Sequence, residues 1–591
     1  MKVADLQGIE RWHGLTLDFA YPPNYPFDKV DVRPVDQQMR RKRHQSRRDG
    51  DLCYMQEELE GWALGYGIDR AILGAEQWFR GEITGHFEDE VPAAELIAYF
   101  EGWTDHVRSV LIPDHVLHDQ PITLYGELNL EWDGEKHGLA LANVDRKVNN
   151  VPERERQRVN TQLWRSVRGP QKVAEVPGLW LRLTSEPRPF SDLAGLEEAL
   201  IQHGGISPRR FQQIVEERLS RSGRVLGWLP IGLTYPARVP SSTTAEHEWL
   251  FFCLEWPTLA KNLVKARRLR PSVWKHVVLR GIPSYSVRRS DLLRRQGPLY
   301  NAERLAASHV VVVGTGALGS PVARQLTASG VGQVTLVEHD VVKPGNVMRH
   351  EARMPDIGKL KSVAMEQILY ETYPYVDVQT IPGTRTTNGL FEELMLNADQ
   401  HPTLIIATVA VRAVDGQIDE VARRAAPAIP VLHAWVMAQA QVLRAFLYRD
   451  RETACFWCNG LYAKDRQDGI ENDYLLEPSV EHQPFFETSC ASPVFAGGGN
   501  AHALAAHIIV DMALDVLHER LPDRESHWVF AGNRIRDLDE TFPVAPLTVA
   551  RRGFTPHAAC PVCNDTILSA ELSEEQRASY DQAMGEIPHE A

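Results

Sequence analysis

The stretch HVVVVGTGALGSPVARQL, residues 309–326, decides the fold of the C-terminal part of this chain. It begins with a run of valines that predicts a buried strand, and it ends in a helical pattern. Between the two, Gly314, Gly316 and Gly319 form GxGxxG. A glycine loop at the start of a helix presents backbone N–H groups and the positive end of the helix dipole, which together bind phosphate. The stretch therefore predicts a strand, loop and helix that hold a nucleotide.

Strands and helices alternate along the chain around this motif. The expected strands are 309–314, 333–340, 376–382, 403–409 and 430–436, and a helix is expected at 362–374. This order predicts an α/β, Rossmann-like domain with a right-handed parallel sheet and helices on both faces. We place this domain at residues 301–591.

Length and composition set the broad class. The chain has 591 residues, of which 43% are hydrophobic and 24% charged, so we expect about three or four globular domains. A net charge of -14 argues against nucleic acid or an anionic membrane as the main partner. No apolar run of membrane-spanning length and no signal peptide are evident, so a cytoplasmic protein is expected.

Two further regions precede the nucleotide domain. For residues 1–112 we expect a small α+β unit. Alternating apolar and polar residues at 10–34 suggest an antiparallel meander, and a helix with one buried face is expected later. That face comprises Leu96, Phe100, Trp103, Val107 and Leu111. Residues 113–300 predict a β-rich middle domain with a helical insertion at 193–204. We find no chemical motif in it, and Cys253 is expected to be a core residue.

Two CxxC pairs predict a metal site. The ligands would be Cys455 and Cys458 in ACFWCNG and Cys560 and Cys563 in ACPVCND. Four thiolates are the usual ligand set of a tetrahedral zinc ion, and they leave no position for a reacting water. The pattern therefore indicates structural Zn²⁺.

The glycine motif alone leaves NAD, FAD and ATP as possible ligands. Glu338 ends the second strand, where an acidic side chain commonly binds ribose hydroxyls. The segment EHDVVKPGNVMRHEARMPDIGKLKS, residues 338–362, adds Asn346, Arg349 and Lys361. A redox dinucleotide needs no such cationic set, so the segment favours a triphosphate.

Residues 314–350 make the comparison specific, because this stretch resembles the adenylation domain of the ThiF, MoeB and ubiquitin-activating family. The resemblance covers roughly residues 303–565. It implies that ATP binds the glycine loop and acidic residue, that an arginine and a lysine act on the phosphates, and that a carboxylate binds Mg²⁺. By position these residues are Gly314, Gly316, Gly319, Glu338, Asp340, Asn346, Arg349 and Lys361.

The chain departs from this family at one place. The family usually has a threonine-aspartate pair after the fourth strand, whereas this chain reads ATVAVRAVDGQID. Asp415 and Asp419 are the candidate substitutes for the missing magnesium ligand.

The resemblance also assigns chemistry to Cys490, in FFETSCASPVFAGGG. In the related enzymes a cysteine in this region attacks the acyl adenylate and forms a thioester, and a helix N-terminus would lower the pKa of such a thiol. The alternative is that Cys490 is an ordinary core residue.

Cys53, in HQSRRDGDLCYMQ, is the second candidate thioester site. The preceding basic residues favour the thiolate. The order YPF, His44, DGDLCY, Trp62 is similar to that of ubiquitin-conjugating enzymes and their bacterial relatives. Their HPN signature is missing, so either His44 or backbone amides would stabilise the oxyanion.

A conjugating-type domain fused to an activating-type domain resembles the ligase family of CBASS antiphage operons. The resemblance implies adenylation of a protein C-terminus with ATP, capture on Cys490, transfer to Cys53 and conjugation to target lysines, catalysed by a homodimer. The implied partner is a cGAS-like nucleotidyltransferase. Three alternatives stay open: conjugation of a ubiquitin-like modifier, adenylation of a sulfur carrier, and a non-catalytic nucleotide-binding scaffold.

Overall fold

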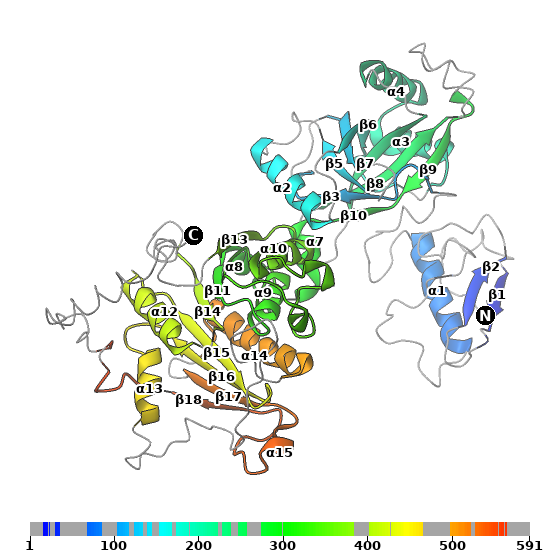
Figure 1. Cartoon of the computed structure of the whole chain (residues 1–591). Helices are drawn as coiled ribbons and strands as arrows, with labels where there is room; N and C mark the ends of the chain where they lie inside the picture. Colours follow the sequence, from blue (N-terminus) through cyan, green and yellow to red (C-terminus); the bar gives the residue numbers. More distant parts are fainter. Residues whose placement is uncertain are drawn as a thin grey trace. The chain divides into compact units, whose positions relative to one another are not determined.

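The structure analysed is a computed structural model (Figure 1). It describes residues 16–21, 23, 30–35, 52, 68–84, 103–116, 123–133, 139–144, 153–167, 173–187, 190–222, 227–237, 246–256, 274–297, 299–382, 401–409, 411–425, 427–464, 497–521, 526–553, 555–560 and 562–563. The chain divides into two compact units, residues 1–160 with 170–292 and residues 161–169 with 293–591. Each unit is described by itself below.

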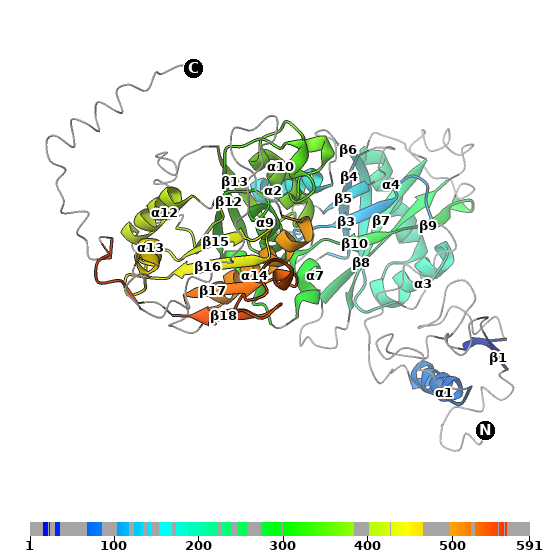
Figure 2. The ribbon, with the colours of Figure 1, turned by 60° about the horizontal axis from the view of Figure 1, so that its bottom comes forward.

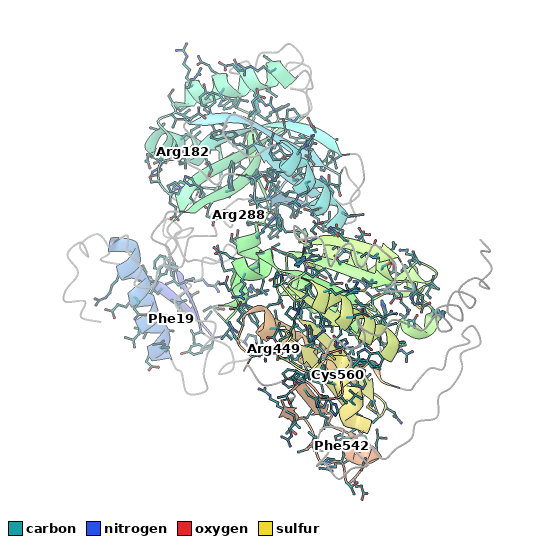
Figure 3. All side chains as sticks on the ribbon, turned by 90° about the vertical axis from the view of Figure 1, so that its left-hand side faces the viewer. Phe19, Arg182, Arg288, Arg449, Phe542 and Cys560 are labelled. Atoms are coloured by element: carbon teal, nitrogen blue, oxygen red, sulfur yellow. The ribbon has the colours of Figure 1, made fainter. Side chains whose placement is uncertain are left out.

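Unit 1 begins with two short strands and a helix. Strands β1 (Leu17–Ala20) and β2 (Asp31–Pro34) pair antiparallel, as the alternating pattern predicted, and helix α1 (Ile68–Thr84) follows. Their shared core consists of Val30, Val32, Leu52, Ala71, Ala75 and Trp78, with Phe19 (labelled in Figure 3) packed against it. The backbone nitrogen of Leu52 donates to the carbonyl of Val32 at 2.7 Å, which fixes the residue before Cys53 beside β2.

An eight-stranded mixed sheet forms the rest of unit 1, in the order β10-β3-β5-β4-β6-β7-β8-β9. The strands are β3 (Ser109–Ile112), β4 (Tyr125–Trp132), β5 (Leu139–Val144), β6 (Ala174–Arg182), β7 (Trp228–Ala237), β8 (Glu246–Glu255), β9 (Val278–Ile282) and β10 (Ser284–Ser286). The helices are α2 (Glu153–Ser166), α3 (Leu193–Gly204), α4 (Pro208–Ser222) and α7 (Arg289–Leu293). Cys253 on β8 is fully buried in this sheet, as expected for a core residue. The end of α2, from Thr161, belongs to unit 2.

The sequence predicted a helix that buries Leu96, Phe100, Trp103, Val107 and Leu111, and this prediction is wrong in its second half. Trp103 forms a bridge with Gly281 and is 40% exposed, and residues 109–112 are strand β3. β3 pairs with β5 and β10, so the boundary predicted at residue 112 falls at the end of a strand of the larger sheet. Leu96 and Phe100 lie outside the described residues. The long-range pairing of Ser109–Ile112 therefore overrides the helical spacing of its apolar residues.

Unit 2 contains a second eight-stranded sheet, in the order β13-β12-β11-β14-β15-β16-β17-β18. Its strands are β11 (His309–Val313), β12 (Gln333–Glu338), β13 (Asp377–Pro382), β14 (Leu404–Ala407), β15 (Val431–Met437), β16 (Val442–Tyr448), β17 (His527–Ala531) and β18 (Val549–Arg552). The five strands predicted from the sequence, β11 to β15, are present and parallel. Three antiparallel strands, β16 to β18, extend the sheet beyond β15. The parallel sheet was therefore predicted correctly, and its antiparallel extension was missed.

Helices cover this sheet. They are α8 (Ala302–Ala307), α9 (Gly319–Ala328), α10 (Lys361–Thr372), α12 (Arg412–Arg424), α13 (Phe456–Lys464), α14 (Gly499–Leu517) and α15 (Ile535–Leu538), with 3-10 turns η5 (Arg294–Gln296), η6 (Pro344–Asn346) and η7 (Met354–Asp356). Figure 2 shows α9 and α14 beside each other and α12 with α13, as their contacts require. Ile418, Val421 and Ala422 of α12 share one core with alternate residues of β11 and β14.

Helix α14 is long and apolar enough, by length and composition, to cross a membrane. The sequence analysis did not single it out. More than half of its apolar window, 56%, is buried, and it contacts α9, β14 and β15. That packing is what a core helix shows, and a single such helix is weak support for a membrane span.

Candidate nucleotide site and cysteine cluster

The glycine loop joins β11 to α9, where the sequence predicted it. Gly314 has φ +83°, a conformation that favours glycine, and a Cβ on Gly319 would lie 1.9 Å from the Gly314 carbonyl oxygen. Gly316 has open space around its Cα. Two of the three glycines are thus required by backbone geometry, and the third leaves room for a ligand to approach the loop.

Glu338, at the end of β12, holds this loop. Its Oε2 accepts hydrogen bonds from the Thr315 backbone nitrogen (2.9 Å) and hydroxyl (3.2 Å). Its Oε1 accepts from the backbone nitrogens of His339 (2.8 Å) and Asp340 (2.9 Å). The carboxylate is 7% exposed. The acidic residue expected to bind ribose therefore also braces the loop against the end of the neighbouring strand.

Lys361 is anchored at the same end of the sheet. Its Nζ lies 2.7 Å from Asp340 Oδ2, and its backbone nitrogen donates to the Asp340 carbonyl at 2.9 Å. Burial by itself would raise the pKa of Asp340, but the hydrogen bond and charge of Lys361 lower it overall. The first residue of α10 thus brings a fixed positive charge beside the loop that Glu338 holds.

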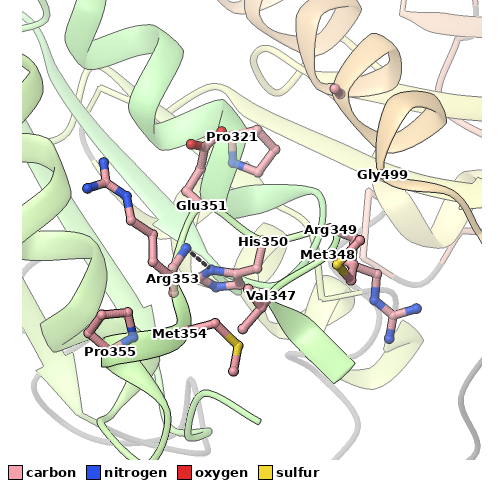
Figure 4. Close-up of a pocket in the computed structure, with 12 residues that line it drawn as sticks. Pro321, Val347, Met348, Arg349, His350, Glu351, Arg353, Met354, Pro355 and Gly499 are labelled. Atoms are coloured by element: carbon pink, nitrogen blue, oxygen red, sulfur yellow. Dashed lines mark hydrogen bonds between the residues drawn. The ribbon is translucent and has the colours of Figure 1, made fainter. Parts of the chain in front are cut away.

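Arg349 lies on the segment that follows. It lines an open cavity of about 530 Å³ together with Met348, Met354, Pro321 and the start of α14 (Figure 4). A Cβ on Gly499 would be 2.4 Å from the Met348 carbonyl oxygen, so α14 begins in close contact with this segment. Asn346 has a local role, because its Oδ1 accepts a hydrogen bond from the Lys343 backbone nitrogen at 2.9 Å.

Two site residues were missed in the sequence. His350 Nε2 lies 2.6 Å from the Thr315 carbonyl oxygen, and Thr408, after β14, donates through its hydroxyl to the Gly314 carbonyl at 2.6 Å. Thr408 follows a predicted strand at the edge where the glycine loop lies, which is a signal that could have identified it. Nothing in the sequence points to His350, because its partner is a backbone carbonyl far away along the chain.

Asp415 and Asp419 do not fit a magnesium site. They flank the buried His433, with Asp415 Oδ1 2.9 Å from Nδ1 and Asp419 Oδ1 2.7 Å from Nε2. Asp419 Oδ2 accepts a hydrogen bond from the backbone nitrogen of Phe456. Both carboxylates are thus buried in an ionic cluster on α12 and β15, and we assign no magnesium ligand.

The four predicted zinc ligands meet, with their sulfur atoms all within 4.8 Å of one another. Neighbouring Sγ atoms are 3.5 Å (Cys455 to Cys560), 3.5 Å (Cys458 to Cys563) and 3.7 Å (Cys455 to Cys458) apart. Thiolates at about 2.3 Å from a tetrahedral zinc lie about 3.8 Å apart, so the cluster fits this ion. Cys560 is labelled in Figure 3.

Further groups donate to the sulfur atoms. The His557 backbone nitrogen lies 3.3 Å from Cys458 Sγ, and the guanidinium of Arg423 lies 3.8 Å from Cys563 Sγ. Such donors offset the negative charge of four thiolates around one divalent ion.

Cys53 and Cys490 both lie outside the described residues, as do His44 and Trp62. Leu52, beside Cys53, and the residues from 497 onward, which follow Cys490 along the chain, are described. The positions of these neighbours are the only geometry that bears on the two predicted thioester sites.

Comparison with known proteins gives a family for part of the chain. Residues 291–509 match the model of the ThiF family. The chain is 26% identical over 185 residues to the ATP-dependent ubiquitin transferase-like protein Cap2 of Pseudomonas aeruginosa, covering 30% of this chain and 32% of that protein. It is 36% identical over 122 residues to a sulfur carrier protein adenylyltransferase of Thermus thermophilus, covering 20% of this chain and 45% of that protein.

Among solved structures, E. coli MccB aligns with a TM-score of 0.32 and 15% identity, covering 44% of this chain and 68% of that one. The curated relatives named above are matched over less than half of their own length. Residues 291–509, the stretch that matches the ThiF family model, hold the glycine loop, Glu338, Arg349 and Lys361.

Proposed function

We propose that this protein uses ATP to adenylate the C-terminal carboxylate of a protein partner. The observation that carries the proposal is the braced glycine loop with Lys361 fixed beside it, inside the segment that matches the ThiF family. Two relatives are named an ATP-dependent ubiquitin transferase-like protein and a sulfur carrier protein adenylyltransferase, which supports ATP-dependent adenylation here.

In the first step a partner carboxylate oxygen attacks the α-phosphorus of ATP. The bond to the β-phosphate oxygen breaks, pyrophosphate leaves, and an acyl adenylate forms. Glycine-loop N–H groups, Lys361 and Arg349 would neutralise charge that develops on the phosphates. Because Asp340 already holds Lys361, this charge is in place before ATP binds.

In the second step the thiolate of Cys490 attacks the acyl carbon and AMP leaves, which gives a thioester. Along the chain after Cys490, helix α14 begins at Gly499, in close contact with Met348, the residue before Arg349. The described chain from residue 497 onward thus borders the segment that carries Arg349, and this supports Cys490 as the proposed nucleophile.

In the third step the thiolate of Cys53 takes the acyl group from Cys490, and an amine, proposed to be a target lysine, then attacks to form an amide and release the thiol. Leu52, the residue before Cys53 in the sequence, is buried and its backbone nitrogen donates to Val32 of β2, which supports a folded unit in this part of the chain. A cGAS-like nucleotidyltransferase encoded nearby is the proposed partner, in antiphage defence. The same proposal includes that the protein is a homodimer and acts in the cytoplasm.

The test is to express the full chain with each neighbouring gene product and to compare reducing with nonreducing gels. Wild type, Cys490→Ala, Cys53→Ala and Lys361→Met would be run side by side, and shifted bands identified by mass spectrometry. The proposal expects a thiol-labile adduct that is absent in Cys490→Ala and Lys361→Met and that accumulates on Cys490 in Cys53→Ala.

Each competing function gives its own pattern. A sulfur-carrier enzyme, as in the Thermus thermophilus relative, would adenylate a small carrier and be indifferent to Cys53→Ala. A ubiquitin-like modifier would give the same relay with a different partner mass. If no neighbour forms an adduct although ATP binds, the ligase is excluded in favour of a nucleotide-binding scaffold.

A further inference from the structure

His350 bridges two segments that both border the nucleotide site. Its Nδ1 accepts a hydrogen bond from the Ala352 backbone nitrogen at 2.8 Å, the contact dashed in Figure 4. Its Nε2 lies 2.6 Å from the carbonyl oxygen of Thr315, at the centre of the glycine loop. One edge of the ring therefore faces its own segment and the other faces the loop.

These two contacts define the state of the ring. Because Nδ1 accepts from an N–H group it carries no proton, so Nε2 must carry the proton that it donates to Thr315. The side chain is 8% exposed. Burial lowers the pKa of His350 to about 4, in agreement with a neutral ring.

Thr315 is consequently held from both sides of its peptide. Glu338 accepts from its nitrogen and hydroxyl, and His350 donates to its carbonyl oxygen. Within the described residues, Thr315 therefore makes three hydrogen bonds to the side chains of these two residues. Removing the His350 donor would leave a buried carbonyl without this partner and let the peptide rotate.

The segment that carries His350 is itself tied to the helix that follows the loop. The backbone nitrogen of Glu351 donates to Ser320 Oγ at 3.3 Å, and the Glu351 carboxylate pairs with Arg324 of α9 at 2.9 Å. Arg349 immediately precedes His350 and lines the cavity of Figure 4. The position of Arg349 relative to the glycine loop is thus set by residues 350 and 351.

We propose that His350 is a positioning residue: by donating from Nε2 to the Thr315 carbonyl it holds the glycine loop open for phosphate and in register with Arg349. The inference rests on the proposed function only in that ATP is the ligand. It extends that function by assigning a residue that neither the glycine motif nor the charged set identifies.

Two substitutions separate the two edges of the ring. In His350→Gln the amide nitrogen can take the place of Nε2 and keep the donor to Thr315. In His350→Asn the side chain is shorter and can replace only Nδ1, so the bond to Ala352 is kept and the bond to Thr315 is lost. Both variants stay polar and of similar size, so both are expected to fold.

The matched control is His309→Asn. His309 is also buried, and its Nε2 also makes one short hydrogen bond, to Thr335 Oγ1 at 2.8 Å, but it lies at the opposite end of β11 from the glycine loop. His309→Asn therefore removes a comparable buried hydrogen bond from the same sheet and leaves the nucleotide site unchanged.

The measurement is the ATP dissociation constant of the full chain by calorimetry with magnesium present, with melting temperature and zinc content recorded for each variant. We expect His350→Asn to weaken ATP binding roughly tenfold, the cost of one buried hydrogen bond. His350→Gln should stay within about threefold of wild type, and His309→Asn within about twofold while its melting temperature falls.

The inference is overturned if His350→Asn binds ATP like wild type, if Asn and Gln variants lose affinity equally, or if His309→Asn loses as much as His350→Asn. Absence of ATP binding in the wild-type chain is a different result, because it would remove the proposed function and this inference together.

Discussion

The carboxylate of Glu338 accepts two hydrogen bonds from a single residue of the glycine loop, Thr315, at 2.9 Å from its nitrogen and 3.2 Å from its hydroxyl. All four donors to Glu338 are uncharged groups, so the negative charge of the carboxylate is what makes these bonds strong. A loop built from glycines has little intrinsic preference for one conformation. Its shape therefore depends on an acid at the end of the adjacent strand.

The first prediction concerns this charge. Glu338→Gln keeps the size of the side chain but replaces one carboxylate oxygen by an NH₂ group. That group cannot accept the two hydrogen bonds that the oxygen accepted. We expect ATP affinity to fall by tenfold or more, since two buried donors lose their partner. Calorimetric titration with ATP measures the effect.

Glu519→Gln serves as the control for that experiment, because Glu519 pairs with Arg304 at the surface and its side chain is 78% exposed. This variant should bind ATP like wild type. Equal affinities for Glu338→Gln and wild type would show that the loop holds its shape without the carboxylate.

The second prediction concerns Lys361. Lys361→Met keeps the apolar stem and removes the charge that pairs with Asp340 at 2.7 Å. The pKa of Asp340 should rise, because Lys361 makes the largest contribution among the groups that lower it against the effect of burial. We expect formation of the thiol-labile adduct to fall at least about a hundredfold, the size of one preorganised electrostatic contact.

The comparison for Lys361 is Lys359→Met. Lys359 also pairs with an aspartate, Asp356 at 2.8 Å, but its side chain is 52% exposed and lies outside the loop contacts. The Lys359→Met variant should form the thiol-labile adduct at the wild-type rate. If Lys361→Met also forms the adduct at the wild-type rate, Lys361 does not neutralise charge on the ATP phosphates.

How far the sequence predicts this site depends on the range of the contacts involved. Gly314, Gly319 and Glu338 could be identified because strand, loop and acidic strand end follow one another in a fixed order along the chain. The four cysteines could be identified because ligand spacing within each CxxC pair is set by the metal. His350 and Thr408 both act through backbone carbonyls of the loop, which a side-chain pattern does not reveal. Thr408 at least follows a predicted strand at the edge where the loop lies, whereas nothing in the sequence points to His350.

The errors have the same physical origin. The apolar residues between 103 and 111 have helical spacing. The strand Ser109–Ile112 nevertheless pairs with β5 and β10, which lie far away along the chain. Asp415 and Asp419 were reasonable magnesium ligands by position, but a buried histidine on β15 lies between them. Tertiary partners decided each case, and local pattern does not contain them.

The third prediction concerns the cysteine cluster. Cys455, Cys458 and Cys560 belong to the core that α12 shares with β11 and β14, so losing the ion should loosen that core. Cys458→Ser is expected to hold substantially less than one zinc per chain and to melt roughly 5–10 °C lower. Elemental analysis and a thermal melt measure the two effects.

Cys253→Ala is the appropriate reference, because Cys253 is buried in unit 1 and takes no part in the cluster. It should keep full zinc content even if its stability falls. Full zinc in Cys458→Ser, or a melt unchanged by loss of zinc, would contradict a structural metal.

The fourth prediction is that stability is greatest near pH 6.5. Burial lowers the pKa of His350 to about 4, and burial with nearby arginines lowers that of His527 to about 3. In the unfolded chain both return to about 6.5. Below that pH the unfolded state binds protons that the native state does not, so the free energy of unfolding falls as the pH drops from 6.5 toward 4.

His433 acts in the opposite direction. Burial would lower its pKa, but Asp419 and Asp415 raise it to about 9. The native state then keeps a proton that the unfolded state releases above about 6.5, so this stability is complete below 6.5 and is lost as the pH rises through 9. Urea unfolding at pH 4.5, 6.5 and 9 should show a maximum in the middle. The double variant His350→Gln, His527→Gln should make the decline on the acidic side less steep and leave the alkaline side unchanged, because two of the buried histidines that take up protons on unfolding are gone. If the acidic decline persists unchanged in the double variant, His350 and His527 are not its source.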